Sequence, residues 1–167
     1  MKIKVLALAA LVALLPSCGV MPGGSQSVSD EDAALVAAAR QNHEMTIEVD
    51  RIIPVGMPSK TTFDGYKLSI KDGKVNADLP FFGTSHTAVI YGVDATGIVF
   101  EDCPIEIIEN NSKADKGRYI WDFTAKCNNE RVEVQITFWD NGSAQISCVC
   151  TNRSNMSYSG RLIKMKD

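Results

Sequence analysis

Alternation of apolar and polar residues over positions 119–151 constrains the fold of this 167-residue chain more than any other sequence feature. Between 119 and 126, an aromatic residue or alanine occupies every second position. The same period returns at Val132, Val134 and Phe138. Because successive side chains of a β-strand point to opposite faces, this period predicts strands that bury one face. We therefore place Trp121 and Phe138 in the core.

The turn that follows Trp139 determines how two of these strands pair. The sequence Asp-Asn-Gly at 140–142 can form a three-residue loop with a left-handed glycine and a bulge. This loop places Val134 opposite Cys148, so that apolar residues share one face. A two-residue turn would place Cys148 opposite Gln135 and would mix the two faces. Burial of one face therefore predicts the three-residue loop.

Further strands are indicated by alternation, or by apolar runs between turn residues, at 46–50, 66–70, 74–78, 87–91, 98–101, 105–109 and 158–164. Asp72-Gly73 is typical of a hairpin turn between two of them. Sequential hairpins predict a mainly β fold, with about nine strands in an antiparallel β-sandwich or β-barrel.

One short N-terminal helix is predicted ahead of the strands, over residues 30–42. Ser29 is a suitable N-cap residue, and Asp32 stands three positions later, in the capping-box place. Acidic residues at the start, with Arg40 and His43 near the end, suit the helix dipole. Most of its apolar residues are alanines, so the helix can either pack closely on a sheet or serve as a spacer arm.

The first 18 residues have the pattern of a bacterial lipoprotein signal. Lys2 and Lys4 precede an apolar run at 5–15, which is too short to cross a bilayer core of ~30 Å. Ser17-Cys18 then resembles the lipobox, in which the cysteine is lipidated and becomes the new N-terminus. The sequence therefore predicts lipidation of Cys18.

This interpretation divides the chain into three parts. We predict a lipoprotein signal peptide at 1–17, a lipid-anchored flexible tether at 18–29 and a single β-rich domain at 30–167. The lipid on Cys18 would hold the protein in the cell envelope, because several acyl chains anchor more firmly than one. No acidic run follows Cys18, so we expect an outer-membrane lipoprotein that faces the periplasm rather than the cell exterior.

Charge and composition exclude some partners. The formal net charge is −3, and it becomes −5 once the two lysines of the signal are removed. A mildly acidic chain argues against binding to nucleic acid or electrostatic binding to anionic lipid. Hydrophobic residues make up 45% of the chain, which suits one globular domain.

Four cysteines remain once Cys18 is assigned to the anchor: Cys103, Cys127, Cys148 and Cys150. Cys148 and Cys150 lie two apart on one strand, a geometry that bridges poorly. Any disulfides would therefore join Cys103 and Cys127 to that pair, in either order. Free buried thiols are the alternative, which we favour because a domain of this size does not need disulfides. Cys-x-Cys also lacks the usual spacing of zinc ligands, so no metal site is predicted.

Several short motifs occur in a familiar order. They are Leu79-Pro80-Phe81-Phe82-Gly83, Gly97-Ile98-Val99-Phe100, the aromatic strand from Tyr119, Asn141-Gly142-Ser143-Ala144, Asn152-Arg153-Ser154 and Tyr158-Ser159-Gly160. Over most of the chain, this order resembles a family of Bacteroidetes envelope lipoproteins catalogued as domain of unknown function 4251. Phe81 stands where tyrosine is commoner in that family. The resemblance implies a compartment and a fold, and it implies no activity because the family has none established.

The segment 79–83 is the best candidate for an interaction loop. Pro80 holds Leu79 extended, and Gly83 permits a sharp turn. Two adjacent aromatic residues, Phe81 and Phe82, cannot both face one core on an extended chain. One of them would then meet a ligand, a partner or lipid headgroups, unless neighbouring loops bury both.

No motif typical of catalysis, metal binding or cofactor binding stands out, and we predict no catalytic residue and no cofactor. The two histidines are His43 and His86, and Ser85 precedes His86. A nucleophile-elbow pattern is absent from the sequence, and adjacent residues point apart on an extended chain. We therefore interpret His86 as a surface-loop residue.

Three functions follow from these features. The favoured one is a non-catalytic envelope lipoprotein that binds an unidentified partner, such as another envelope protein, or supports an assembly. The second is a carrier that holds a small apolar ligand inside a barrel. The third is a hydrolase that uses His86 and nearby carboxylates. A large pocket lined by the aromatic strand would favour the carrier, and a filled interior would favour the first function.

Overall fold

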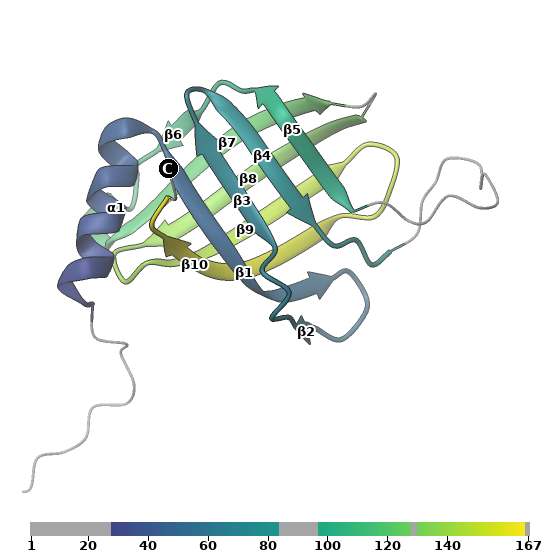
Figure 1. Cartoon of the computed structure of the whole chain (residues 1–167), viewed down its shortest axis with the longest axis horizontal. Coiled ribbons are helices and arrows are strands. Elements are labelled where there is room, and N and C mark those ends of the chain that lie inside the picture. Colours follow the sequence, from purple (N-terminus) through teal and green to yellow (C-terminus); the bar gives the residue numbers. More distant parts are fainter. Residues whose placement is uncertain (1–27, 84–96, 128–129, 166–167) are drawn as a thin grey trace, which may run out of the picture.

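The computed structural model describes residues 28–83, 97–127 and 130–165, which contain one α-helix, one short 3-10 helix and ten strands (Figure 1). The elements are α1 (Asp30–Asn42), β1 (Met45–Pro54), β2 (Lys60–Thr61), β3 (Lys67–Lys71), β4 (Lys74–Leu79), β5 (Ile98–Pro104), β6 (Ile108–Asn110), η1 (Ala114–Lys116), β7 (Arg118–Cys127), β8 (Glu130–Trp139), β9 (Ser143–Cys150) and β10 (Met156–Ile163).

All ten strands belong to one antiparallel sheet. Their order is β5-β4-β3-β1-β10-β9-β8-β7-β6, and β2 pairs with β1 outside this path. The sheet curls into a half-barrel, so that β5 at one edge lies against β7 near the other edge. The predicted mainly β class with one N-terminal helix is confirmed. The two layers expected of a sandwich are the two halves of one curled sheet.

The inner face of the curled sheet holds the core. Trp121, Phe138 and Tyr158 are fully buried there. The Trp121 ring meets the Phe138 ring edge-on, with 5.1 Å between the ring centroids. Such an aromatic pair contributes about 0.5–1.5 kcal/mol beyond the burial of its surface. The core positions predicted for Trp121 and Phe138 are confirmed, and large side chains fill this interior.

Helix α1 begins and ends where the sequence predicts. The Ser29 hydroxyl accepts a hydrogen bond from the Asp32 backbone N–H at 3.1 Å and so caps the first turn. His43 follows the helix in the left-handed region, with φ of 55°. Val36 and Ala39 are buried, and α1 packs across one end of the sheet beside β10 (Figure 1). The helix is therefore part of the domain and not a spacer arm.

Both predicted hairpin turns form. Gly142 has a φ of 73°, and strands β8 and β9 pair with Val134 opposite Cys148, as the three-residue loop requires. Asp72 and Gly73 have φ values of 50° and 68° and join β3 to β4. Two consecutive positive φ values are typical of the tight turns whose twist matches that of the flanking strands.

The strands differ most from the prediction in two places. β2 has only two residues, and the sequence analysis did not predict it. The strand expected at 105–109 is shortened to Ile108–Asn110. The reason is that the Ile105 N–H donates a hydrogen bond to the Gly73 carbonyl at 2.9 Å, which draws this segment away from β7. The strand predicted at 87–91 lies outside the described residues.

Candidate functional site

The predicted interaction loop at 79–83 packs against one end of the sheet. Leu79 is fully buried, and the Tyr158 hydroxyl donates a hydrogen bond to the Pro80 carbonyl at 2.9 Å. Gly83 lies so close to Ser154 that a Cβ at this position would be 2.8 Å from the Ser154 Cβ. Real Cβ atoms essentially never come that close. The loop is therefore held by side chains from the β9–β10 connection and from β10.

The two aromatic rings of the loop each lie under a cation. The guanidinium carbon of Arg153 is 4.9 Å from the centroid of the Phe81 ring. Nζ of Lys60 is 4.0 Å from the centroid of the Phe82 ring. Both rings are half-buried. Cation–π contacts of this kind contribute about 0.5–1 kcal/mol at exposed sites. These contacts hold both aromatic residues against the fold.

Arg153 and Glu130 form an ion pair with two hydrogen bonds. Arg153 Nε donates to Glu130 Oε1 at 2.8 Å, and Arg153 Nη2 donates to Glu130 Oε2. Their side chains are only 14% and 21% exposed. Burial alone would lower the pKa of Arg153, but the hydrogen bond and the negative charge of Glu130 raise it above its ordinary value. Arg153 Nη1 also donates to the Gly97 carbonyl at 3.3 Å.

We name this group the Arg153 cluster, and its members are Pro80, Phe81, Glu130, Arg153 and Tyr158. It closes the end of the half-barrel opposite α1. Glu130 begins β8, and the other end of β8 leads to Gly142, which lies beside Asp32 of α1. Burial, together with the nearby thiols, raises the pKa of Tyr158, so its hydroxyl stays a donor. The polar groups of the cluster pair with one another, and the arrangement suits closure of the fold.

The cysteines differ from the prediction in part. Cys103 is disulfide-bonded, whereas Cys148 and Cys150 are buried free thiols. The favoured interpretation, free buried thiols, is therefore confirmed at Cys148 and Cys150 and wrong at Cys103, and the alternative of bridges to Cys148 and Cys150 is wrong. Burial raises the pKa of both free thiols, which disfavours the reactive thiolate. The side chain of Cys127, and the whole of Cys18, lie outside the described residues.

Of the two histidines, the structure describes His43. His43 Nε2 lies 3.2 Å from Glu109 Oε1, and its ring centroid is 5.9 Å from that of Trp121. His86 and Ser85 lie outside the described residues. Among the described residues, no group of three or more His, Cys, Asp or Glu side chains is placed to hold a metal ion.

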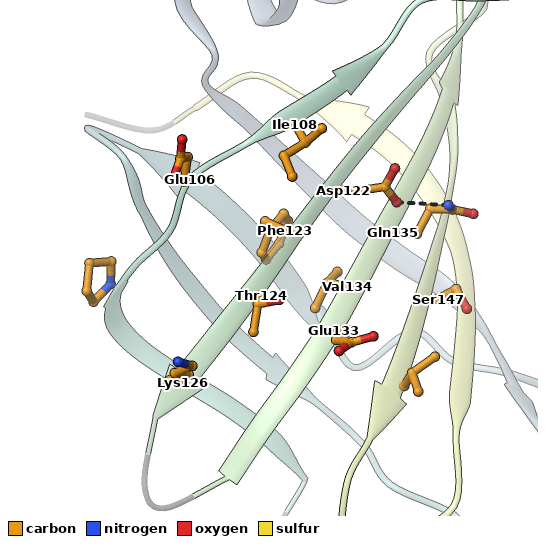
Figure 2. Close-up of a pocket in the computed structure, with 12 residues that line it drawn as sticks. Glu106, Ile108, Asp122, Phe123, Thr124, Lys126, Glu133, Val134, Gln135 and Ser147 are labelled. Atoms are coloured by element: carbon orange, nitrogen blue, oxygen red, sulfur yellow. Dashed lines mark hydrogen bonds between the residues drawn. The ribbon is translucent and has the colours of Figure 1, made fainter.

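A second candidate is a groove of about 710 Å³ on the outer face of β7, β8 and β9 (Figure 2). We name it the outer groove. We call Asp122, Thr124, Gln135 and Ser147 its floor and Glu106, Ile108, Lys126, Glu133 and Val149 its rim, and Pro104, Phe123 and Val134 complete the lining. The floor residues face outward because they alternate with the core residues of the same strands. Figure 2 shows Glu106 and Ile108 on one side of β7, with Gln135 and Ser147 on the other.

The outer groove combines apolar and acidic surface. Ile108 and Val149 are 65% and 46% exposed, although both are large apolar residues. Gln135 Nε2 donates a hydrogen bond to Asp122 Oδ1 at 2.8 Å across the floor. Glu106 and Asp122 add negative charge, and Lys126 is the cation that lines this groove. Such a surface can bind an extended segment that has apolar and basic side chains.

Sequence patterns did not reveal this groove. Its polar residues have the ordinary alternation of a solvent-facing strand side, so no residue type distinguishes them. One signal was present: Val149 is an apolar residue between Cys148 and Cys150, at an outward position. Two other hollows lie outside the core: one of about 270 Å³ between α1 and the ends of β1 and β10, and one of about 510 Å³ over β3, β4 and β5.

Comparison with known proteins gives a family match and a similar solved structure. Residues 28–162 match the family described as domain of unknown function (DUF4251). The chain is also similar to the crystal structure of a DUF4251 family protein from Bacteroides eggerthii, with 14% sequence identity and a TM-score of 0.59. That match covers 80% of this chain and 87% of the other. At this identity the likeness establishes the fold alone. No curated protein matches the chain.

Proposed function

This chain belongs to the DUF4251 family, and we propose that it is a non-catalytic, lipid-anchored module of the cell envelope that binds another envelope protein. One observation carries the proposal. The outer groove, at about 710 Å³ the largest of the hollows described above, lies on the outside of the fold, where a macromolecule can reach it. Its exposed apolar residues, Ile108 and Val149, and its carboxylates suit a polypeptide partner.

The filled interior supports protein binding over transport of a small apolar ligand. A carrier of that kind needs a cavity inside the curled sheet. Trp121, Phe138 and Tyr158 occupy this interior and are fully buried. Phe123 and Val134, which are largely buried, also line the outer groove, but most of its lining residues belong to the outward faces of β7, β8 and β9. The carrier is therefore the weaker candidate.

The N-terminal pattern supports the anchor. The lipobox-like Ser17-Cys18 ends an apolar run, and the eleven residues after Cys18 are rich in Gly and Ser. A chain of that length and composition reaches roughly 18–20 Å on average, which would keep the domain close to the membrane. We place the protein on the periplasmic face of the outer membrane. No helix in the described part of the chain is both long enough and apolar enough to cross a bilayer.

Cell fractionation tests the location. We expect the full chain to partition with outer membranes and Cys18→Ser to appear in the soluble periplasmic fraction. Ser27→Ala, in the proposed tether, is the matched control and should stay with the membranes. A Cys18→Ser protein that still sediments with membranes would contradict the lipid anchor.

Site-specific cross-linking in the native envelope tests partner binding. A photoreactive residue at Val149 on the rim of the outer groove should give one discrete adduct of higher mass. The same residue at Ser69, on the outer face of β3, is the control and should give none. Failure of Val149 and of every other surface position to form an adduct would refute the proposed binding function.

A further inference from the structure

Strand β7 is only partly paired on one of its two edges, although β5 lies against it. Along its whole length it pairs with β8. On the other edge, β6 pairs only with Ile120, Trp121 and Asp122 of β7. Within the described chain, residues 123–126 therefore have a backbone partner on one edge only. Unpaired N–H and C=O groups on a strand edge form a template for another strand.

The local sequence keeps this edge open. The Ile105 N–H is bound to the Gly73 carbonyl at 2.9 Å, on the turn between β3 and β4. Pro104 has no N–H with which to pair. The chain therefore joins β7 only from Ile108 onward, and a strand that extended the line of β6 would lie against the open edge.

The outer groove lies beside this open edge. Glu106 and Ile108, which line the groove, flank the place where pairing with β7 begins. Thr124 and Lys126 line the groove from the unpaired part of β7 itself. In Figure 2, the labelled Glu106 lies to one side of β7, while Thr124 and Lys126 project from β7 toward the viewer. Backbone groups that can pair with a partner strand thus lie beside side chains that can select its sequence.

We propose that the unpaired edge of β7 at residues 123–126, together with the outer groove, binds an extended segment of a partner polypeptide by strand addition. This inference rests on the proposed function as a protein-binding module and names its site. The added strand runs antiparallel to β7, in the direction of β6. Residues 123–126 span about 13 Å, so they pair with about four residues of the partner. Main-chain hydrogen bonds supply affinity, and alternate side chains supply specificity.

The charges of the site define the chemistry of the segment. Glu106 and Asp122 are acidic, while Lys126 is the cation beside them. Exposed Ile108 and Val149 add apolar contact area at the rim. A segment of alternating basic and apolar residues complements this surface. A second copy of this chain fits less well, because the chain is acidic overall and like charges oppose each other across paired strands.

Hydrogen–deuterium exchange with a synthetic strand tests the inference. The probe is an acetylated, amidated peptide, Thr-Lys-Val-Lys-Val-Lys-Thr, added to the full chain in detergent. At ten times its Kd, we expect exchange in the fragment that covers 119–127 to slow about ten-fold. The matched control is the same peptide with alternate backbone nitrogens methylated on the pairing edge. It keeps the side chains and charges but cannot pair, so it should give no protection.

A second comparison tests the charge assignment. Glu106→Lys should weaken the affinity for the peptide about three-fold, which is typical of an exposed charge pair. Glu101→Lys makes the same change at an exposed site on β5 and should leave the affinity unchanged. Equal effects of these two variants would refute the assignment of the acidic groove.

Three outcomes would overturn strand addition. They are protection of 119–127 by the methylated peptide, absence of protection at millimolar peptide, and protection of that fragment caused by self-association seen in sedimentation. If Val149 still cross-links to a partner in the envelope, the binding function survives and only its site and mode fail. If no adduct forms anywhere on the surface, the binding function itself fails.

Discussion

The Arg153 cluster and the outer groove share strand β8, but their acidic residues on this strand differ in exposure and in pairing. Glu130, in the cluster, is 21% exposed and binds Arg153 through both carboxylate oxygens. Glu133, three residues along the same strand, is 58% exposed and meets Arg131 at 2.9 Å on the surface. The Glu130 carboxylate is bonded within the fold, whereas the Glu133 carboxylate remains accessible to solvent.

The short sequence motifs lie in the first of these two regions, where they stabilise the fold. The motifs Leu79-Pro80-Phe81-Phe82-Gly83, Asn152-Arg153-Ser154 and Tyr158-Ser159-Gly160 come together around the Arg153 cluster. Gly160 is also required by packing, since a Cβ there would lie 2.0 Å from the Glu48 carbonyl oxygen. We therefore attribute these motifs to closure of the half-barrel, and we look for binding on the outer groove.

Loss of Glu130 should have the largest effect on stability. Glu130→Ala leaves the largely buried Arg153 without its counter-charge, and we expect the free energy of unfolding to fall by about 3 kcal/mol. Glu133→Ala removes the same group from an exposed pair on the same strand and should cost about 0.5 kcal/mol. Urea unfolding followed by tryptophan fluorescence measures both. Similar losses in the two variants would erase the distinction between the two regions.

Alkaline pH should have the second largest effect on stability, and it should act at the end of the half-barrel that the Arg153 cluster closes. Burial raises the pKa of Cys148 and Tyr158 above their ordinary values of 9.0 and 10.0. Each group therefore stabilises the fold below its unfolded pKa, and this contribution is lost at higher pH because the unfolded chain ionises first. Stability should fall from about pH 9, by up to about 1.4 kcal/mol per pH unit for each group.

Cys148→Ala isolates one part of this pH dependence. Unfolding curves at pH 8 to 10 should show a shallower decline for the variant than for the original chain, whatever its stability at neutral pH. Parallel declines would mean that the Cys148 thiol ionises equally easily in both states.

The hydroxyl of Tyr158 should contribute a smaller amount. Tyr158→Phe removes the hydrogen bond to the Pro80 carbonyl, and we expect a loss of about 1 kcal/mol in thermal or urea unfolding. Tyr66→Phe is the control, because the Tyr66 hydroxyl has no hydrogen-bond partner among the described residues. It should change stability by less than about 0.5 kcal/mol. A larger loss from Tyr66→Phe than from Tyr158→Phe would contradict the role of this bond.

The outer groove should tolerate substitution with the smallest effect on stability. Val149→Lys should shift the free energy of unfolding by less than about 0.5 kcal/mol, because Val149 is exposed. The added positive charge repels a basic segment and should nevertheless reduce the yield of adducts from a photoreactive residue at Thr124. Val55→Lys, at another exposed valine, should leave that yield unchanged. A full adduct yield from Val149→Lys would argue that the groove is not the binding surface.

Local sequence signals predicted the parts of the fold that depend on neighbours in the chain. The Ser29 cap defined the start of α1, and the glycines of two turns defined the hairpins and the pairing of Val134 with Cys148. The shortening of β6 was not predicted, because it depends on a hydrogen bond between Ile105 and Gly73, which are far apart in sequence.

The candidate sites were less accessible to sequence analysis for the same reason. Arg153 and Glu130 are 23 positions apart, and only the curled sheet brings them together. The disulfide of Cys103 was missed because spacing along the chain does not report distance across the half-barrel. The outer groove depends on how β7, β8 and β9 twist beside the segment that contains Glu106, and no residue pattern encodes that shape.

The most direct test of the division between a closed end and a binding face is hydrogen–deuterium exchange on the lipidated protein in native outer membranes, compared with the purified protein. We predict slower exchange in the membranes for the fragment that covers 119–127, and equal exchange for fragments that contain Glu130 or Arg153. Equal exchange at 119–127 in both samples, or protection confined to the Arg153 cluster, would contradict the account.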